Sequence, residues 1–224
     1  MQVTRMRGAL AVGLALGVAL SPLAALASDN KIALVPGGPH PYFAPWEQAA
    51  ADAQKDFGIA AGEYKVPAEW KLELQTELFE SLAAQGYAGI GYFPGDAVGV
   101  NSTIAELKAS DIPAVALGGC ALDPTDTAFC MATDVYASAY LGTKALIEAM
   151  GGKGAVVHLA GLLVDPNTTL RVQAVEKAVA ETNGAVTLLQ TLGDTDNQEQ
   201  GDQKINALLA AQKEKDAAHD AQIR

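Results

Sequence analysis

Short apolar runs that alternate with helical segments are the feature that most constrains the fold of this chain. Residues 31–35 form one such run, closed by Pro36 and two glycines, which is typical of a buried parallel strand that ends in a turn. In residues 45–55, which follow, apolar side chains recur at helical spacing. The repeated alternation predicts an α/β fold with parallel sheets covered by helices. The predicted strands are 31–35, 64–66, 89–93, 114–117, 129–132, 154–160 and 186–190, and the predicted helices are 45–55, 72–85, 104–109, 136–150, 168–181 and 202–212.

The alternation falls into two series, which predicts two Rossmann-like lobes joined near Asp134. The first lobe spans residues 28–133 and the second residues 134–224. The second lobe holds two strand candidates, whereas an open sheet has about five strands. From about Lys213 the chain is charged and has one large apolar side chain, Ile223, so this tail cannot add a buried strand. We therefore expect an incomplete second lobe in a chain shortened at its C-terminus.

The first 27 residues have the pattern of a cleaved signal peptide. Arg5 and Arg7 give a basic start, residues 8–20 are uncharged and mostly small or aliphatic, and Ala25 and Ala27 form a small-residue cleavage pattern. A retained membrane anchor is the alternative, but a span needs about 20 apolar residues. We expect cleavage after Ala27 and an exported, periplasmic protein.

Charge opposes binding to nucleic acid or to anionic membranes. The chain has 15 basic and 26 acidic side chains and a formal charge of −11 at pH 7. Half of its 224 residues are hydrophobic, so it can bury a core. Polyanions repel such a chain, which excludes nucleic acid as an expected partner.

The two cysteines, Cys120 and Cys130, are separated by a turn-rich segment. An oxidising compartment permits a disulfide between them, and two buried free thiols are the alternative. The histidines lie far from both cysteines in sequence, so we expect no metal site.

Aromatic side chains gather after the first predicted strand, where parallel sheets bind ligands. Tyr42 and Phe43 can form a flat wall against the C–H face of a sugar, and His40 can offer a hydrogen-bonding edge. The alternative is that these rings only cap the sheet. We interpret Trp70, after the second strand, as packing.

Four polar residues at strand ends or helix starts complete the candidate site. Asp96 and Asp134 can accept hydrogen bonds from hydroxyl groups, although both also suit helix N-caps or turns. Asn167 and Arg171 fall on the loop and the first turn of a predicted helix in the second lobe. The guanidinium of Arg171 suits vicinal hydroxyls or a carboxylate, and a solvated helix face is the alternative.

The sequence holds no GxGxxG loop after a strand, no GxSxG elbow and no P-loop lysine. We therefore expect no cofactor and no catalytic residues. An exported enzyme on a Rossmann-like scaffold stays an alternative, and turnover would reveal it.

Five segments in this order resemble the type I periplasmic sugar-binding proteins of ABC importers, the ribose-binding-like group: KIALVPGGPHPYF, YFPGDAVG, IPAVALGG, ATDVYASAYLGTKAL and NTTLRVQAVEKAV. The resemblance implies that His40, Tyr42 and Phe43 face the sugar, that Arg171 binds it and that Asp134 lies near the hinge. Gly118 and Gly119 stand where this group usually has an acid and an arginine, which implies a sugar other than ribose.

The resemblance implies a monomeric, non-catalytic receptor that closes on a sugar or polyol and presents it to an ABC permease in the inner membrane. Three alternatives remain at this stage: a shortened fragment deficient in binding, an autoinducer or chemotaxis receptor of the same fold, and a repressor of the related family. The predicted signal peptide and the acidic charge oppose the repressor.

Overall fold

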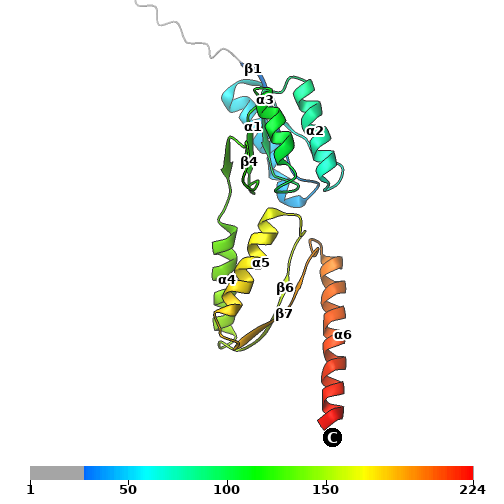
Figure 1. Cartoon of the computed structure of the whole chain (residues 1–224). Helices are drawn as coiled ribbons and strands as arrows, with labels where there is room; N and C mark the ends of the chain where they lie inside the picture. Colours follow the sequence, from blue (N-terminus) through cyan, green and yellow to red (C-terminus); the bar gives the residue numbers. More distant parts are fainter. Residues whose placement is uncertain (1–27, 224) are drawn as a thin grey trace, which may run out of the picture.

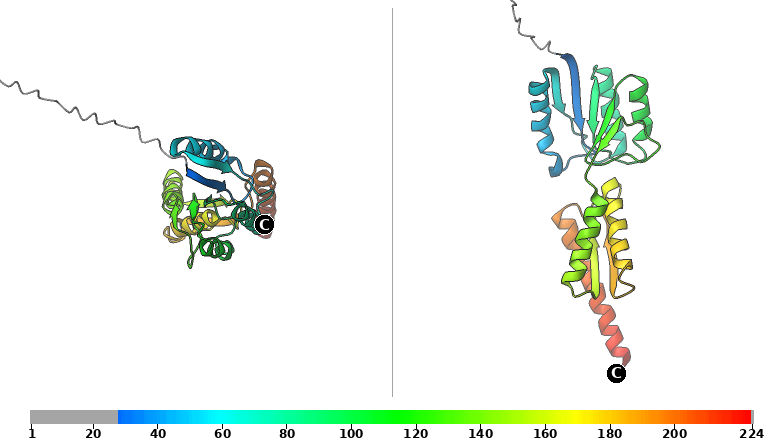
Figure 2. Two further views of the ribbon diagram at one scale, coloured as in Figure 1. Left: turned by 90° about the horizontal axis from the view of Figure 1, so that it is seen from above. Right: turned by 90° about the vertical axis from the view of Figure 1, so that its left-hand side faces the viewer.

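The computed structural model describes residues 28–223 and shows two α/β lobes stacked end to end (Figures 1 and 2). The first lobe contains β1 (Ser28–Val35), the 3-10 turn η1 (Pro41–Phe43), α1 (Pro45–Phe57), β2 (Ile59–Tyr64), α2 (Leu72–Ala84), β3 (Gly89–Tyr92), α3 (Asn101–Ala109), β4 (Ala114–Leu117) and β5 (Phe129–Met131). The second contains α4 (Val135–Ala149), β6 (Gly154–Leu159), α5 (Pro166–Ala180), β7 (Val186–Leu192) and α6 (Gln198–Ile223).

The first lobe is built on a five-stranded sheet whose order is β2-β1-β3-β4-β5, with every neighbouring pair parallel. Helix α1 covers one face, and α2 and α3 lie together on the other (Figure 2). Ala33 and Val35 of β1 are fully buried, as the apolar run predicts. The α/β class with parallel sheets is confirmed. All strands of this sheet therefore end at the same edge, which faces the second lobe.

Two element boundaries differ from the sequence prediction by five residues or more. Strand β2 begins at Ile59 instead of residue 64, because Gly58 ends α1 in the left-handed conformation (φ 62°) and the chain enters the strand at once. A Cβ on Gly62 would lie 2.1 Å from the carbonyl oxygen of Ala50, so a glycine at this position of β2 allows the strand to pack closely against α1. Helix α6 also extends to Ile223, well beyond the predicted end at 212, through the charged tail.

A disulfide closes the loop between β4 and β5. Cys120 and Cys130 are bonded, with their Cα atoms 5.6 Å apart, which confirms the disulfide and rules out the free thiols. The loop is also tied to the rest of the lobe, because Leu122 N–H donates to the Ala97 carbonyl at 2.8 Å. The segment that leads out of β4 is therefore fixed at both ends.

The second lobe holds a two-stranded parallel sheet of β6 and β7. Helices α4 and α5 pack against each other and against one face of this sheet, while α6 stands apart on the other side (Figure 1). The small core comprises Ile147, Val156, Ala178, Val179 and Val186. The predicted signal peptide and its cleavage site lie outside the described residues. Within 28–223 no helix has the length and apolar character needed to cross a membrane.

Candidate functional site

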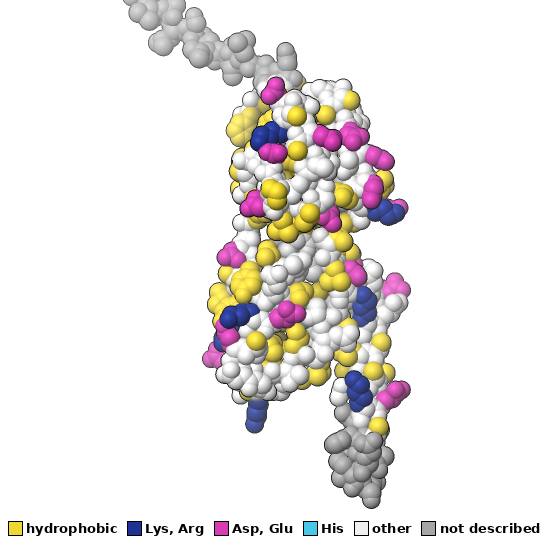
Figure 3. All heavy atoms as spheres, viewed as in Figure 1, with side chains coloured by type: hydrophobic (Ala, Val, Ile, Leu, Met, Phe, Trp, Pro, Cys, Tyr) yellow, Lys and Arg dark blue, Asp and Glu magenta, His cyan; other side chains and the backbone are white. Residues whose placement is uncertain are grey.

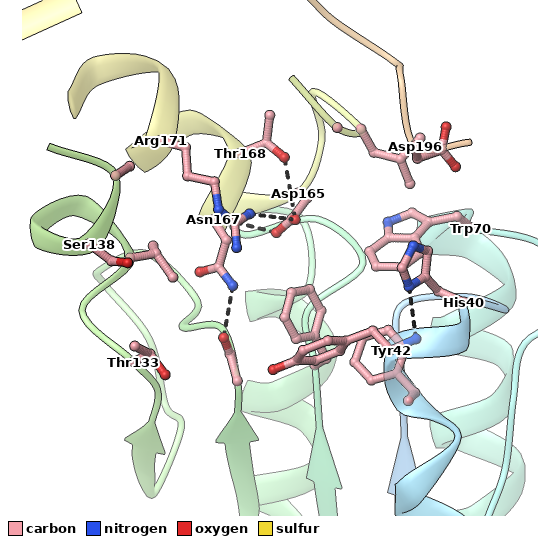
Figure 4. A pocket seen from close by; sticks show the side chains of 17 residues that line it. His40, Tyr42, Trp70, Thr133, Ser138, Asp165, Asn167, Thr168, Arg171 and Asp196 are labelled. Carbon is pink, nitrogen blue, oxygen red and sulfur yellow. Dashed lines mark hydrogen bonds and ion pairs between the residues drawn. The ribbon is translucent and has the colours of Figure 1, made fainter. Parts of the chain in front are cut away.

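A cavity of about 600 Å³ lies between the two lobes, at the carboxyl ends of the first lobe's strands (Figure 4). This volume is in the range of small-molecule sites, and the place is where open parallel sheets bind ligands. Both lobes contribute to the lining, which consists of His40, Tyr42, Phe43, Trp70, Phe93, Gly118, Thr133, Val135, Ser138, Ala139, Gly161, Leu162, Asp165, Asn167, Thr168, Arg171 and Asp196.

The first lobe supplies an aromatic wall. Phe43 is 2% exposed, and its ring centroid lies 5.1 Å from that of Tyr42, 5.2 Å from that of Phe93 and 6.1 Å from that of Trp70. Most of these contacts are edge-to-face, the favoured arrangement for aromatic pairs. Tyr42 remains 62% exposed, so one ring of a fixed cluster is open to a ligand.

His40 introduces η1 and borders the cavity. Its Nδ1 accepts a hydrogen bond from the Tyr42 backbone N–H at 3.1 Å. In the neutral imidazole the proton then resides on Nε2, because one ring nitrogen accepts while the other donates. His40 is thereby held as a donor beside the aromatic wall.

Gln75 fastens the two loops that carry this wall. Its side chain is fully buried, and Nε2 donates to the carbonyls of Pro36 at 3.0 Å and Phe93 at 2.7 Å. Its Oε1 accepts from Gly95 N–H at 2.9 Å, and the Trp70 indole N–H donates to the Gly95 carbonyl at 2.9 Å. The chain segments that leave β1 and β3 are thus joined through one amide.

The second lobe supplies polar groups from the start of α5. Asp165 caps this helix, because its Oδ1 accepts from Asn167 N–H at 2.9 Å. Arg171 Nη1 lies 3.9 Å from Asp165 Oδ2, and its side chain is 46% exposed. Burial raises the pKa of the Asp165 carboxyl above its ordinary value, opposed by the Asn167 N–H and the Arg171 charge. A carboxylate and a guanidinium therefore face the cavity side by side.

The lobes also touch directly at the cavity. Asn167 Nδ2 donates to the carbonyl oxygen of Gly118, just after β4, at 2.8 Å (Figure 4). Asn167 is 7% exposed.

Five of the seven residues expected to bind ligand line the cavity: His40, Tyr42, Phe43, Asn167 and Arg171.

The other two lie outside its lining. Asp96 Oδ1 accepts from the backbone N–H groups of Val98 and Gly99, at 2.9 and 2.7 Å, in the turn before α3. Asp134 Oδ1 accepts from Ala137 N–H at 2.8 Å and caps α4. Both carboxylates accept hydrogen bonds from backbone N–H groups, in the turn and N-cap roles that the sequence analysis gave as the alternative.

Sequence reasoning did not select Asp165, Thr168 or Asp196, and it interpreted Trp70 as packing. Trp70 packs on Phe43 and also borders the cavity. Asp165 carried a usable signal, since an acid before a proline is typical of a helix start. Among the described residues, no three histidine, cysteine or acidic side chains are grouped so that they could hold a metal ion.

Comparison with known families identifies the scaffold. The model of the periplasmic binding protein domain matches residues 32–221. The chain belongs to this family. No curated protein matches the sequence.

Solved structures of periplasmic binding proteins share the fold of this family member. An ABC transporter solute-binding protein from Burkholderia graminis in complex with D-arabinose is 20% identical, with a TM-score of 0.77 over 83% of this chain and 63% of its own. The arabinose-binding protein of a Shewanella species, bound to L-arabinofuranose, is 18% identical, with a TM-score of 0.74 and coverages of 82% and 61%. A Caulobacter protein bound to myo-inositol is 14% identical, with a TM-score of 0.74 and coverages of 84% and 63%. This periplasmic binding protein thus spans about three-fifths of the length of each.

Proposed function

We propose that this periplasmic binding protein is the solute-binding component of an ABC importer and holds a neutral sugar or related polyol between its lobes. One observation carries the proposal: an aromatic wall on one lobe faces hydrogen-bonding and charged groups on the other, across a cavity of about 600 Å³. Sugars offer C–H faces to aromatic rings and hydroxyls to planar donors and acceptors. The similar structures from Burkholderia, Shewanella and Caulobacter hold D-arabinose, L-arabinofuranose and myo-inositol.

The charges of the cavity favour a neutral ligand. Arg171 is the cationic side chain in the lining, and it lies 3.9 Å from the Asp165 carboxylate. Asp196 adds a second acid to the lining. An anionic ligand would meet these two carboxylates, and a cationic one would meet Arg171, whereas hydroxyl groups can bond to both kinds of group.

The proposed receptor is non-catalytic and acts in the periplasm, where a permease accepts the closed form. A ligand that touches both lobes stabilises only the closed arrangement, so binding and closure are coupled.

Isothermal titration of residues 28–224 with D-arabinose, L-arabinose, D-galactose and myo-inositol tests the proposal. We expect saturable binding of at least one compound and a loss of about tenfold or more in Arg171→Ala, since hydrogen bonds to charged groups contribute about 1.5–3 kcal/mol. Lys177→Ala is the matched control, because Lys177 is an exposed cation on the same helix outside the cavity lining. Equal losses in both variants, or no binding of any of the four compounds to the parent chain, would contradict the proposal.

A further inference from the structure

The Asn167–Gly118 hydrogen bond joins the two lobes directly. The donor amide stands on the first turn of α5, and the acceptor carbonyl leaves β4. Its N···O distance is 2.8 Å, within the usual range for a protein hydrogen bond. The two groups therefore form a direct contact between the lobes, which a separation of the lobes at this point would break.

The acceptor is rigidly placed. Gly118 N–H donates to the Met131 carbonyl of β5 at 2.8 Å, and the Cys120–Cys130 disulfide fastens the next residues to the same strand. Gly118 adopts a left-handed conformation (φ 79°), and a Cβ at this position would lie 3.4 Å from the Phe93 ring. The carbonyl is thus held by β5 on one side and by the aromatic wall on the other.

The donor is equally well placed. Asn167 N–H is bonded to Asp165 Oδ1, which fixes the backbone, and its side chain is 7% exposed. A carboxamide has two N–H donors and one acceptor oxygen. The bond to Gly118 uses one of these donors, so that N–H is committed to the opposite lobe.

We infer that Asn167 and Gly118 form a closure latch: a direct bond that stabilises the closed arrangement in the absence of sugar and so raises affinity for every ligand alike. This inference rests on the proposed function. A receptor whose competent state is only partly populated has its affinity reduced by that fraction. The latch raises that fraction, while the choice among sugars stays with the groups that touch the ligand, such as Tyr42 and Arg171.

The test uses Asn167→Ala and Asn167→Asp, with Asn206→Ala as control because Asn206 is an exposed asparagine on α6. Aspartate keeps the shape of the side chain but sets an oxygen against the Gly118 carbonyl. Small-angle scattering of the sugar-free proteins and titration with the four compounds above are measured for each variant, after thermal unfolding has shown that it folds.

We expect a larger radius of gyration for both sugar-free Asn167 variants, most for aspartate, and no change for Asn206→Ala. Loss of one hydrogen bond predicts about two- to tenfold weaker binding of every sugar, by a similar factor for each. An unchanged radius, or a loss confined to particular sugars, would overturn the latch and make Asn167 a ligand contact. The scattering arm needs no ligand, so a latch confirmed by scattering in a chain that binds none of the compounds would refute the proposed function alone.

Discussion

Replacing Gln75 by leucine should destabilise the first lobe through the loss of hydrogen bonds, because the two side chains are similar in volume. The variant leaves three backbone groups without their partner: the Pro36 and Phe93 carbonyls and Gly95 N–H. A buried polar group left unpaired costs about 1–3 kcal/mol, and carbonyls tolerate this better than N–H groups. The total comes to about 3–5 kcal/mol, which lowers the melting temperature of a chain of this size by about 6–20 °C.

Urea unfolding followed by tryptophan fluorescence measures this loss. Both tryptophans of the chain, Trp46 and Trp70, belong to the first lobe, so the signal reports the affected part. Gln48→Leu is the matched control, since Gln48 is exposed on α1 and bonds to Asp52 one turn away. We expect the control to change stability by less than about 0.5 kcal/mol.

The slope of the unfolding free energy against urea should stay constant, so that the midpoint alone moves. A loss below about 1 kcal/mol in Gln75→Leu, relative to the control, would refute the view that this amide fastens the ends of β1 and β3.

Three further outcomes are expected. Replacing Cys120 and Cys130 together by serine frees a ten-residue loop and should lower the unfolding free energy by about 2–3 kcal/mol in urea titrations; an unchanged midpoint would contradict this. Gly62→Ala places a Cβ against the Ala50 carbonyl and should cost about 1–3 kcal/mol or more, unless equal melting temperatures show that the helix can shift. Burial lowers the pKa of His158 below its ordinary 6.5, so the unfolded chain binds the proton first as pH falls. The unfolding free energy should therefore decrease as the pH falls through and below about 6.5 in the parent chain and less in His158→Gln, and parallel curves would refute this.

The sequence by itself determined the layered architecture. Strand and helix periodicities depend on neighbouring residues alone, so the apolar run at 31–35 predicts β1, and the turn after it marks the edge where a ligand can bind. The order of predicted strands and helices also put Tyr42, Phe43 and Arg171 near strand ends and helix starts, and these residues line the cavity. The cysteine spacing permitted the disulfide, and the tertiary structure selected it over the free thiols.

Only the tertiary structure decided which polar groups face the cavity and which hold the backbone. Asp96 and Asp165 both precede helices and look alike in sequence, yet Asp165 borders the cavity because α5 points at the first lobe. Gln75 resembles a surface residue of α2 until the ends of β1 and β3 converge on its amide. The partner of Asn167 lies 49 residues away on the other lobe. Local patterns specify which surface of an element is apolar, whereas a hydrogen bond depends on the position and direction of two groups that only the packed lobes bring together.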